Sequence, residues 1–88
     1  MTQVWKYILD PYNSSVLMPS GAEILSVGEQ GNDVCLWARV DPNAPKVFRD
    51  FLIVGTGHNI PENLSLKFVG TVHIFNRVLV FHIFEKCS

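Results

Sequence analysis

The segment Gly55-Thr56-Gly57-His58 combines two glycines with two side chains that form hydrogen bonds. Glycine lets the backbone approach a ligand closely, and successive amides in such a turn can form a concave site for an anion. Thr56 adds a hydroxyl group, and His58 adds a ring donor or a positive charge. The segment therefore predicts a loop that holds a phosphate-bearing ligand. The alternative is that the glycines only allow positive φ where the chain reverses direction.

Trp37 and Arg39 are two residues apart in an apolar segment, so both are expected on the same face of a strand. An indole and a guanidinium side by side can stack on a base and pair with a phosphate. Both residue types are equally favoured where proteins meet, so an oligomer interface is the alternative. If the Gly55–His58 loop binds a phosphate, Arg39 or Arg49 is expected to neutralise its charge.

The three histidines, His58, His73 and His82, raise the question of a metal site. His73 and His82 fall on the two arms of one predicted hairpin. However, a zinc site needs three or four ligands, and no carboxylate or cysteine has a suitable spacing to them. Hydrogen-bonded histidines in a half-buried sheet are the preferred interpretation. Neither a metal nor a cofactor is expected.

Catalytic motifs are missing from the sequence. Cys35 lies between apolar neighbours, and a buried thiol is usually inert. The sequence contains no Ser/His/Asp motif, no Walker loop and no paired-carboxylate pattern. We therefore expect a protein that is not an enzyme.

The composition limits the class of protein. The chain has 88 residues, enough for a single domain over 1–88, and 48% of them are hydrophobic. A net charge of −1 excludes both a basic surface for nucleic acid and the acidic excess of a DNA mimic. Only 17% of the residues are charged, against about a quarter in a typical domain. This apolar surplus predicts a homo-oligomer, in its simplest form a dimer.

The sequence also indicates a compartment. The most apolar stretch, 68–84, is interrupted by histidine, asparagine and arginine, so it is not expected to cross a membrane as a helix. The first residues lack the features of a signal peptide. Cys35 and Cys87 do not make a disulfide framework, which favours the reducing cytosol.

Apolar residues alternate with a period of two along almost the whole chain. The pattern predicts strands over 4–9, 15–18, 22–29, 33–40, 47–54, 66–75 and 78–85. Hairpins are expected around Gln30-Gly31-Asn32 and Asn76-Arg77, and at most one helical turn near Pro42 or Pro61. The predicted fold is all-β: a small antiparallel barrel or sandwich of six to seven strands. The last strand is apolar on both faces, so it is either central in the fold or part of an oligomer contact.

Several ordered motifs carry a resemblance to a known family. They are VWKY at 4–7, MPSGAEILSV at 18–27, CLWARVDP at 35–42, GTGHNIP at 55–61, GT at 70–71 and LVFHIFE at 79–85. In order and spacing they resemble a family of small phage and prophage proteins to which no activity is assigned. Asn59 departs from the pattern, because a proline is common there. The resemblance implies a phage or prophage origin and action in the cytoplasm of the infected host.

In that setting we expect a binder that acts against host defence. The first hypothesis is an oligomeric β scaffold that sequesters a nucleotide-derived signalling molecule. Its ligand-binding residues would be Gly55, Thr56, Gly57, His58, Trp37, Arg39 and Arg49. The alternatives are a protein-binding inhibitor of a host defence complex, similar in role to anti-CRISPR proteins, and a minor virion or assembly protein.

Overall fold

The computed structural model describes residues 1–87, except for the side chain of Asn13. Over these residues the chain forms seven strands and no helix. The strands are β1 (Gln3–Leu9), β2 (Asn13–Pro19), β3 (Glu23–Gln30), β4 (Asp33–Val40), β5 (Lys46–Gly55), β6 (Ser65–Ile74) and β7 (Leu79–Cys87). The predicted all-β fold is therefore confirmed, with each strand within two residues of its expected ends.

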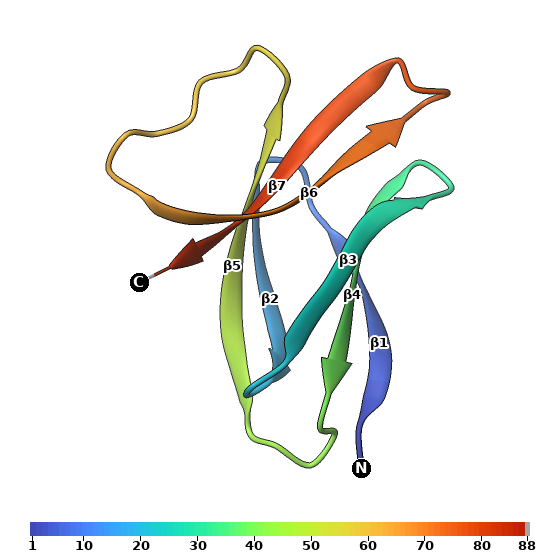
Figure 1. Ribbon diagram of the computed structural model, residues 1–88, viewed down its shortest axis with the longest axis vertical. Coiled ribbons are helices and arrows are strands. Elements are labelled where there is room, and N and C mark those ends of the chain that lie inside the picture. The colour runs from blue at the N-terminus through green and yellow to red at the C-terminus, as the bar shows by residue number, and fades with distance from the viewer. Residues whose placement is uncertain (88) are drawn as a thin grey trace.

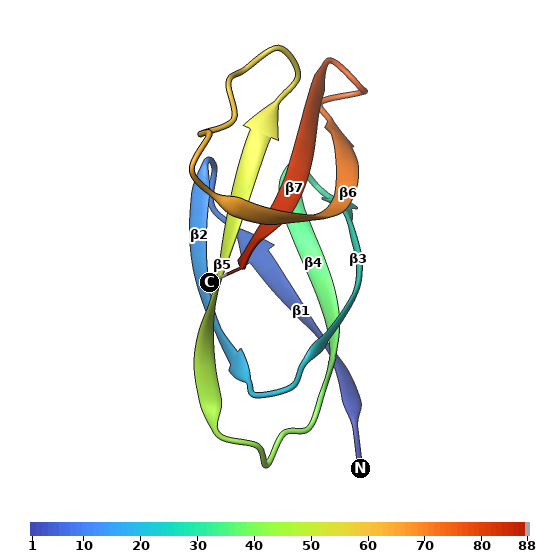
Figure 2. The same ribbon diagram turned by 60° about the vertical axis from the view of Figure 1, so that its left-hand side comes forward.

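Two antiparallel sheets make up the fold. One has three strands in the order β1-β4-β3, and the other has four in the order β2-β5-β7-β6. Figure 2 shows β3 and β6 side by side at one margin of the molecule, with β2 at the opposite margin. The arrangement is a compact sandwich that is nearly closed along the β3–β6 seam.

The core lies between the sheets and follows directly from the alternation in the sequence. On β4, the inward residues predicted to share one face are all buried: Val34, Leu36, Ala38 and Val40. Phe51 and Ile53 of β5 meet them from the other sheet, together with Ile83 of β7. β7 lies between β5 and β6, so both of its edges are paired, while Val80 and Phe84 on its outer face stay partly exposed. An oligomer contact on that face stays a prediction.

One close approach closes the seam between β3 and β6. A Cβ atom at Gly70 would lie only 2.6 Å from Cγ2 of Val27, so glycine is what lets the two strands meet there. Both strands also carry a register shift beside this point, between Ile24 and Ser26 on β3 and between Phe68 and Gly70 on β6. Such bulges bend a strand locally. β3 and β6 therefore approach each other closely at Val27 and Gly70, and a groove lies between them on each side of this point.

The turns differ in how closely they match the expectations. Gln30 pairs with Asp33, which leaves Gly31 and Asn32 as a two-residue turn with φ +64° at Gly31. Near Pro42 the chain forms hydrogen-bonded turns on Asp41 rather than a helical turn, since Asp41 accepts from the amides of Asn43 and Ala44. No helix long and apolar enough to cross a membrane occurs among residues 1–87.

The outer face of the three-stranded sheet carries Trp37. Its ring lies against Gly28 of β3, where a Cβ atom would be 3.3 Å from the indole. Cys35 occupies the same face two residues earlier on β4 and is only 1% exposed. Both cysteines are free thiols, and Cys87 is exposed.

Candidate functional site

The Gly55–His58 segment forms a turn at the end of β5. Gly57 has φ +87°, and the His58 ring folds back to within 3.1 Å of a Cβ position at Gly55. Two of the amides in this turn are already used, because Thr56 donates to Val80 and His58 donates to Gly55. The positive φ thus matches the reversal interpretation of the glycines, and few amides remain for an anion.

The side chain of Thr56 forms a hydrogen bond with His82 of β7. Its hydroxyl lies 2.8 Å from Nε2 of His82, and Nδ1 of the same ring lies 3.1 Å from the hydroxyl of Thr71. These three residues form a polar row on the outer face of the four-stranded sheet, from Thr56 just after β5 across β7 to β6. Hydroxyl groups can donate or accept, so either tautomer of His82 is satisfied and its ring is held in place.

The other predicted ligand-binding residues lie apart from this row. Trp37 and Arg39 belong to the three-stranded sheet, and Arg39 forms an exposed ion pair with Glu23 at 3.4 Å. The structure therefore does not bring them together with the Gly55–His58 turn.

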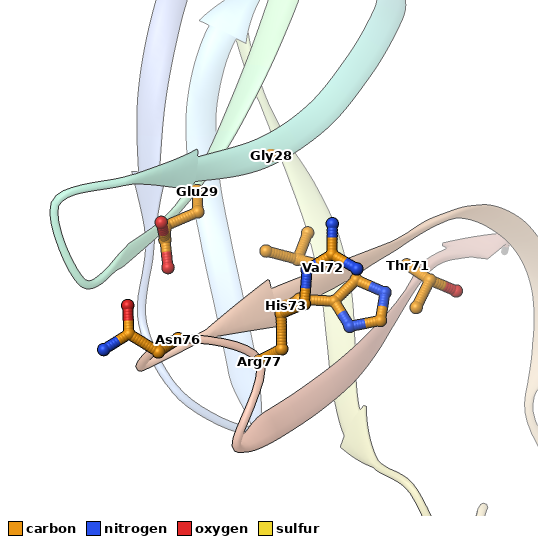
Figure 3. Close-up of a pocket in the computed structure, with 7 residues that line it drawn as sticks. All are labelled: Gly28, Glu29, Thr71, Val72, His73, Asn76 and Arg77. Atoms are coloured by element: carbon orange, nitrogen blue, oxygen red, sulfur yellow. The ribbon is translucent and has the colours of Figure 1, made fainter.

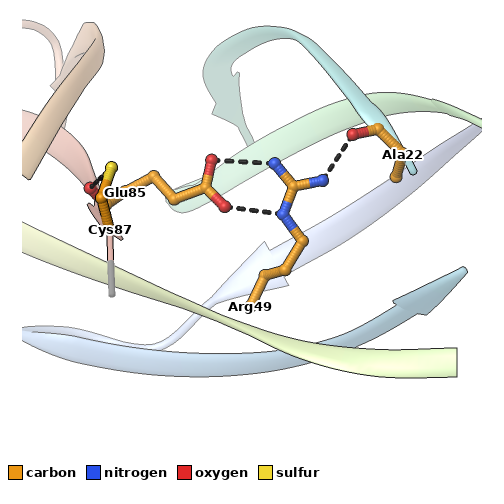
Figure 4. Close-up of polar contacts among 4 residues, drawn as sticks. All are labelled: Ala22, Arg49, Glu85 and Cys87. Carbon is orange, nitrogen blue, oxygen red and sulfur yellow. Dashed lines mark hydrogen bonds and ion pairs between the residues drawn. The ribbon is translucent and has the colours of Figure 1, made fainter. Parts of the chain in front are cut away.

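Arg49 is placed in a structural contact. Its Nε and Nη2 donate to the carboxylate of Glu85 at 2.6 and 2.8 Å, and Nη1 donates to the carbonyl of Ala22 (Figure 4). The hydrogen bond with Glu85 raises the pKa of Arg49 above its ordinary value. The guanidinium of Arg49 thus links β5 to β7 and to the residue that precedes β3. Its donors are occupied by these structural contacts, so it is not available to a ligand.

A groove begins at Thr71, one end of the polar row. It has a volume of about 460 Å³ and lies between β3 and the β6–β7 hairpin. Its lining residues are Gly28, Glu29, Thr71, Val72, His73, Asn76 and Arg77 (Figure 3). Figure 3 shows that His73 comes from β6, Asn76 and Arg77 from the β6–β7 turn, and Glu29 from the facing strand β3. We call this cleft the seam groove.

Arg77 is the distinctive residue of the seam groove. Within residues 1–87 it has no hydrogen-bond or ion-pair partner, whereas Arg39 and Arg49 each pair with a carboxylate. Thr71, His73 and Asn76 add hydroxyl, imidazole and amide donors beside it. Arginine with neighbouring neutral donors is a typical setting for a phosphate or carboxylate.

An unusual backbone holds Arg77 in this position. Phe75, Asn76 and Arg77 have φ of +54°, +54° and +70°, and the turn is closed by a hydrogen bond from Val78 to the carbonyl of Phe75. Left-handed conformations are strained for residues with a Cβ atom, and they cluster at binding and catalytic sites. Positive φ at the two central residues, Asn76 and Arg77, is also what a two-residue hairpin turn requires, so the turn fixes where Arg77 is presented without itself indicating a function.

The sequence contained a usable signal for part of this site. Thr71 and His73 alternate on one face of β6, and His82 pairs with Thr71 from β7, so three polar residues gather on one face of an otherwise apolar hairpin. The hydrogen bonds of His82 match the preferred interpretation of the histidines as hydrogen-bonded residues of the sheet. No group of three or more His, Cys, Asp or Glu side chains in the described part of the chain is placed to hold a metal ion. No sequence pattern pointed to Arg77 beyond its place in the turn.

Comparison with known proteins identifies the family without adding an activity. No curated protein and no solved structure matches the chain. A family model described as a domain of unknown function, DUF7352, matches residues 1–88, and the chain therefore belongs to that family.

Proposed function

We propose that this chain is a non-enzymatic phage protein that binds a small phosphate-bearing ligand in the seam groove. In the host cytoplasm it would sequester a nucleotide-derived signal and so act against host defence. The observation that carries the binding proposal is the unpaired guanidinium of Arg77 among the donors of Thr71, His73 and Asn76. The phage setting is supported by the sequence resemblance alone.

The charge balance of the groove favours one orientation of such a ligand. Glu29 is the acidic residue of the lining, and it does not pair with Arg77. A phosphate held by Arg77 and His73 would leave Glu29 to accept hydrogen bonds from hydroxyl or amino groups of the ligand. Thr71, fixed through His82, would donate its hydroxyl to a phosphate oxygen.

Titration calorimetry against cyclic dinucleotides and cyclic ADP-ribose isomers tests the proposal. Charge-assisted hydrogen bonds to phosphate contribute about 1.5–3 kcal/mol each, so Arg77→Gly is expected to weaken binding about tenfold or more. Arg39→Ala is the matched control, because it removes an equal charge from the other sheet and should leave the affinity unchanged. A bound ligand whose affinity is the same for Arg77→Gly would exclude the seam groove.

We also propose that the chain forms a homo-oligomer, in its simplest form a dimer. Phe48 is 68% exposed and lies opposite Leu17, which is 45% exposed, so an apolar patch remains on β2 and β5. The same patch favours the second candidate function, inhibition of a host defence protein. Light scattering separates the two: about twice the 9.9 kDa of the chain supports the dimer, and 9.9 kDa leaves the patch for a host protein.

A further inference from the structure

A second cavity opens beside the seam groove, on the other side of the β6–β7 turn. It has a volume of about 260 Å³ and lies at the end of the sandwich, between the tips of hairpins β3–β4 and β6–β7. Figure 1 shows these two tips on the same side of the molecule. Apolar side chains form most of its wall: Leu9, Val34, Ile53, Ile74, Phe75 and Phe81. We call this cavity the apolar mouth.

Three polar residues also line the apolar mouth. Asp10, Asn32 and Asp33 line it together with the apolar wall. Neither carboxylate has a side-chain partner among residues 1–87, and both residues are exposed. Ionised carboxylates only accept hydrogen bonds, so the apolar mouth is suited to a ligand that offers hydroxyl or amino donors.

The strained turn connects the apolar mouth with the seam groove. Phe75 lines the mouth, whereas the next two residues, Asn76 and Arg77, line the groove. The facing hairpin is divided in the same way, with Glu29 on the groove and Asn32 on the mouth. Three consecutive left-handed residues thus direct an aromatic ring to one cavity and a guanidinium to the other.

Neither cavity alone suits a whole ligand. The apolar mouth, at about 260 Å³, is smaller than the about 300–1,000 Å³ of a typical small-molecule site. The seam groove is large enough but mostly polar, which suits a phosphate better than a ring system. Together they provide a cation in the groove and, in the mouth, aromatic rings with carboxylate acceptors.

We propose, resting on the function proposed above, that the ligand is a nucleoside phosphate whose base enters the apolar mouth while its phosphate binds Arg77 in the seam groove. The base would lie against Phe75 and Phe81, since aromatic faces stack on bases. The carboxylates of Asp10 and Asp33 would accept from ribose hydroxyls or an exocyclic amine, as carboxylates do in other nucleotide sites.

Calorimetry and ¹⁵N NMR with simple probes test this assignment. Inorganic phosphate, AMP, GMP and UMP are titrated into the natural chain, Phe75→Ala and Arg77→Gly. At least one nucleotide is expected to bind about tenfold tighter than phosphate, and Phe75→Ala should remove that advantage while changing phosphate affinity less than about twofold. Amide signals of Asn32 and Asp33 should shift with the nucleotide and not with phosphate.

Phe68→Ala serves as the matched control. Phe68 and Phe75 are both half-exposed phenylalanines of the same hairpin, but Phe68 lines neither cavity. Its replacement should leave both affinities unchanged.

The outcomes separate the two proposals. If phosphate binds through Arg77 and no nucleotide binds more tightly, the nucleoside assignment is wrong and the anion-binding function stands. If neither phosphate nor any nucleotide binds at millimolar concentration, the proposed function and the nucleoside assignment both fail. Nucleotide binding that Phe75→Ala leaves unchanged would also overturn the role of the apolar mouth.

Discussion

The β3–β6 seam has two grooves, one on each side of the contact between Val27 and Gly70. The seam groove has a volume of about 460 Å³ and includes Arg77. The second groove has a volume of about 320 Å³ and includes Arg49 and Glu85. Both grooves lie along β3 and β6, yet their arginines differ: the charge of Arg49 is neutralised by a carboxylate, and Arg77 has no partner in the described chain.

The difference distinguishes an arginine that stabilises the fold from an arginine that is available to bind an anion. Arg49 uses all three of its nitrogens on Glu85 and Ala22, so it joins β5 to β7 and to the start of β3. Glu85 lies near the C-terminal end of β7, whereas Arg77 lies in the turn that precedes the first residue of β7, where the backbone has positive φ. Residue type alone does not distinguish the two, because a long-range partner decides which guanidinium can meet an anion.

The largest expected effect comes from removing the charge of Glu85. Glu85→Gln leaves the Arg49 guanidinium in a half-buried place without its counter-charge, because the two side chains are only 22% and 15% exposed. We expect the free energy of unfolding to fall by about 2–3 kcal/mol, somewhat less than for a fully buried pair. Urea denaturation measures the change. Glu23→Gln, on the exposed pair with Arg39, is the control and should have almost no effect.

A Cβ atom on Gly70 should disturb the point that separates the grooves. Gly70→Ala would place that atom 2.6 Å from Cγ2 of Val27, and overpacking of this kind costs about 1–3 kcal/mol. The double variant Gly70→Ala with Val27→Ala should recover part of the loss, since it removes the Cγ2 methyl group that the new Cβ atom would meet. Equal stability of the single variant and the natural chain would mean that β3 and β6 do not meet closely there.

Arg77→Gly is expected to stabilise the fold while it removes the anion-binding charge. Glycine adopts φ +70° without strain, and the gain of about 1–2 kcal/mol is partly offset by its greater freedom in the unfolded chain. A net increase of about 0.5–1 kcal/mol in the free energy of unfolding should appear in thermal or urea denaturation. A clear loss of stability would instead show that Arg77 supports the fold, as Arg49 does.

The smallest effect is expected at Arg39. Its ion pair with Glu23 is about 60% exposed on both sides, so Arg39→Ala should change stability by less than about 0.5 kcal/mol. A larger change, or a loss of ligand affinity, would restore the Trp37–Arg39 face as a candidate site and weaken the contrast between the two grooves.

The strands could be predicted from the sequence because the signals for a strand, alternating apolar residues and flanking turn residues, lie within or next to each segment. Alternation within segments such as 33–40 specifies which side chains are buried, and Gly31 marks a turn through its own backbone freedom. The strand over 15–18 was predicted too short, because Asn13 and Pro19 are poor strand residues that are nevertheless paired with Leu52 and Lys46 of β5. Tertiary pairing extended the strand where local preference ended it.

The candidate site was less predictable because it depends on pairs far apart in the chain. Arg49 meets Glu85 across 36 residues, and nothing near Arg49 in the sequence announces that partner. The opening of the seam groove depends on two register shifts and one glycine contact on different strands. The Gly55–His58 segment was correctly located in a turn, but the amide of Thr56 donates to Val80 on β7, a partner that the local sequence does not reveal.

The burial of Cys35 beside Trp37 gives the chain an internal reporter of its own opening. A thiol reagent can modify Cys87 in the folded chain, whereas Cys35 on the central strand β4 becomes reactive only when that sheet opens. The ratio of the two labelling rates therefore measures how often β4 separates from β1 and β3, and it uses only the two natural cysteines of the chain. Ligands that join the hairpin tips β3–β4 and β6–β7 should slow the modification of Cys35 and leave that of Cys87 unchanged.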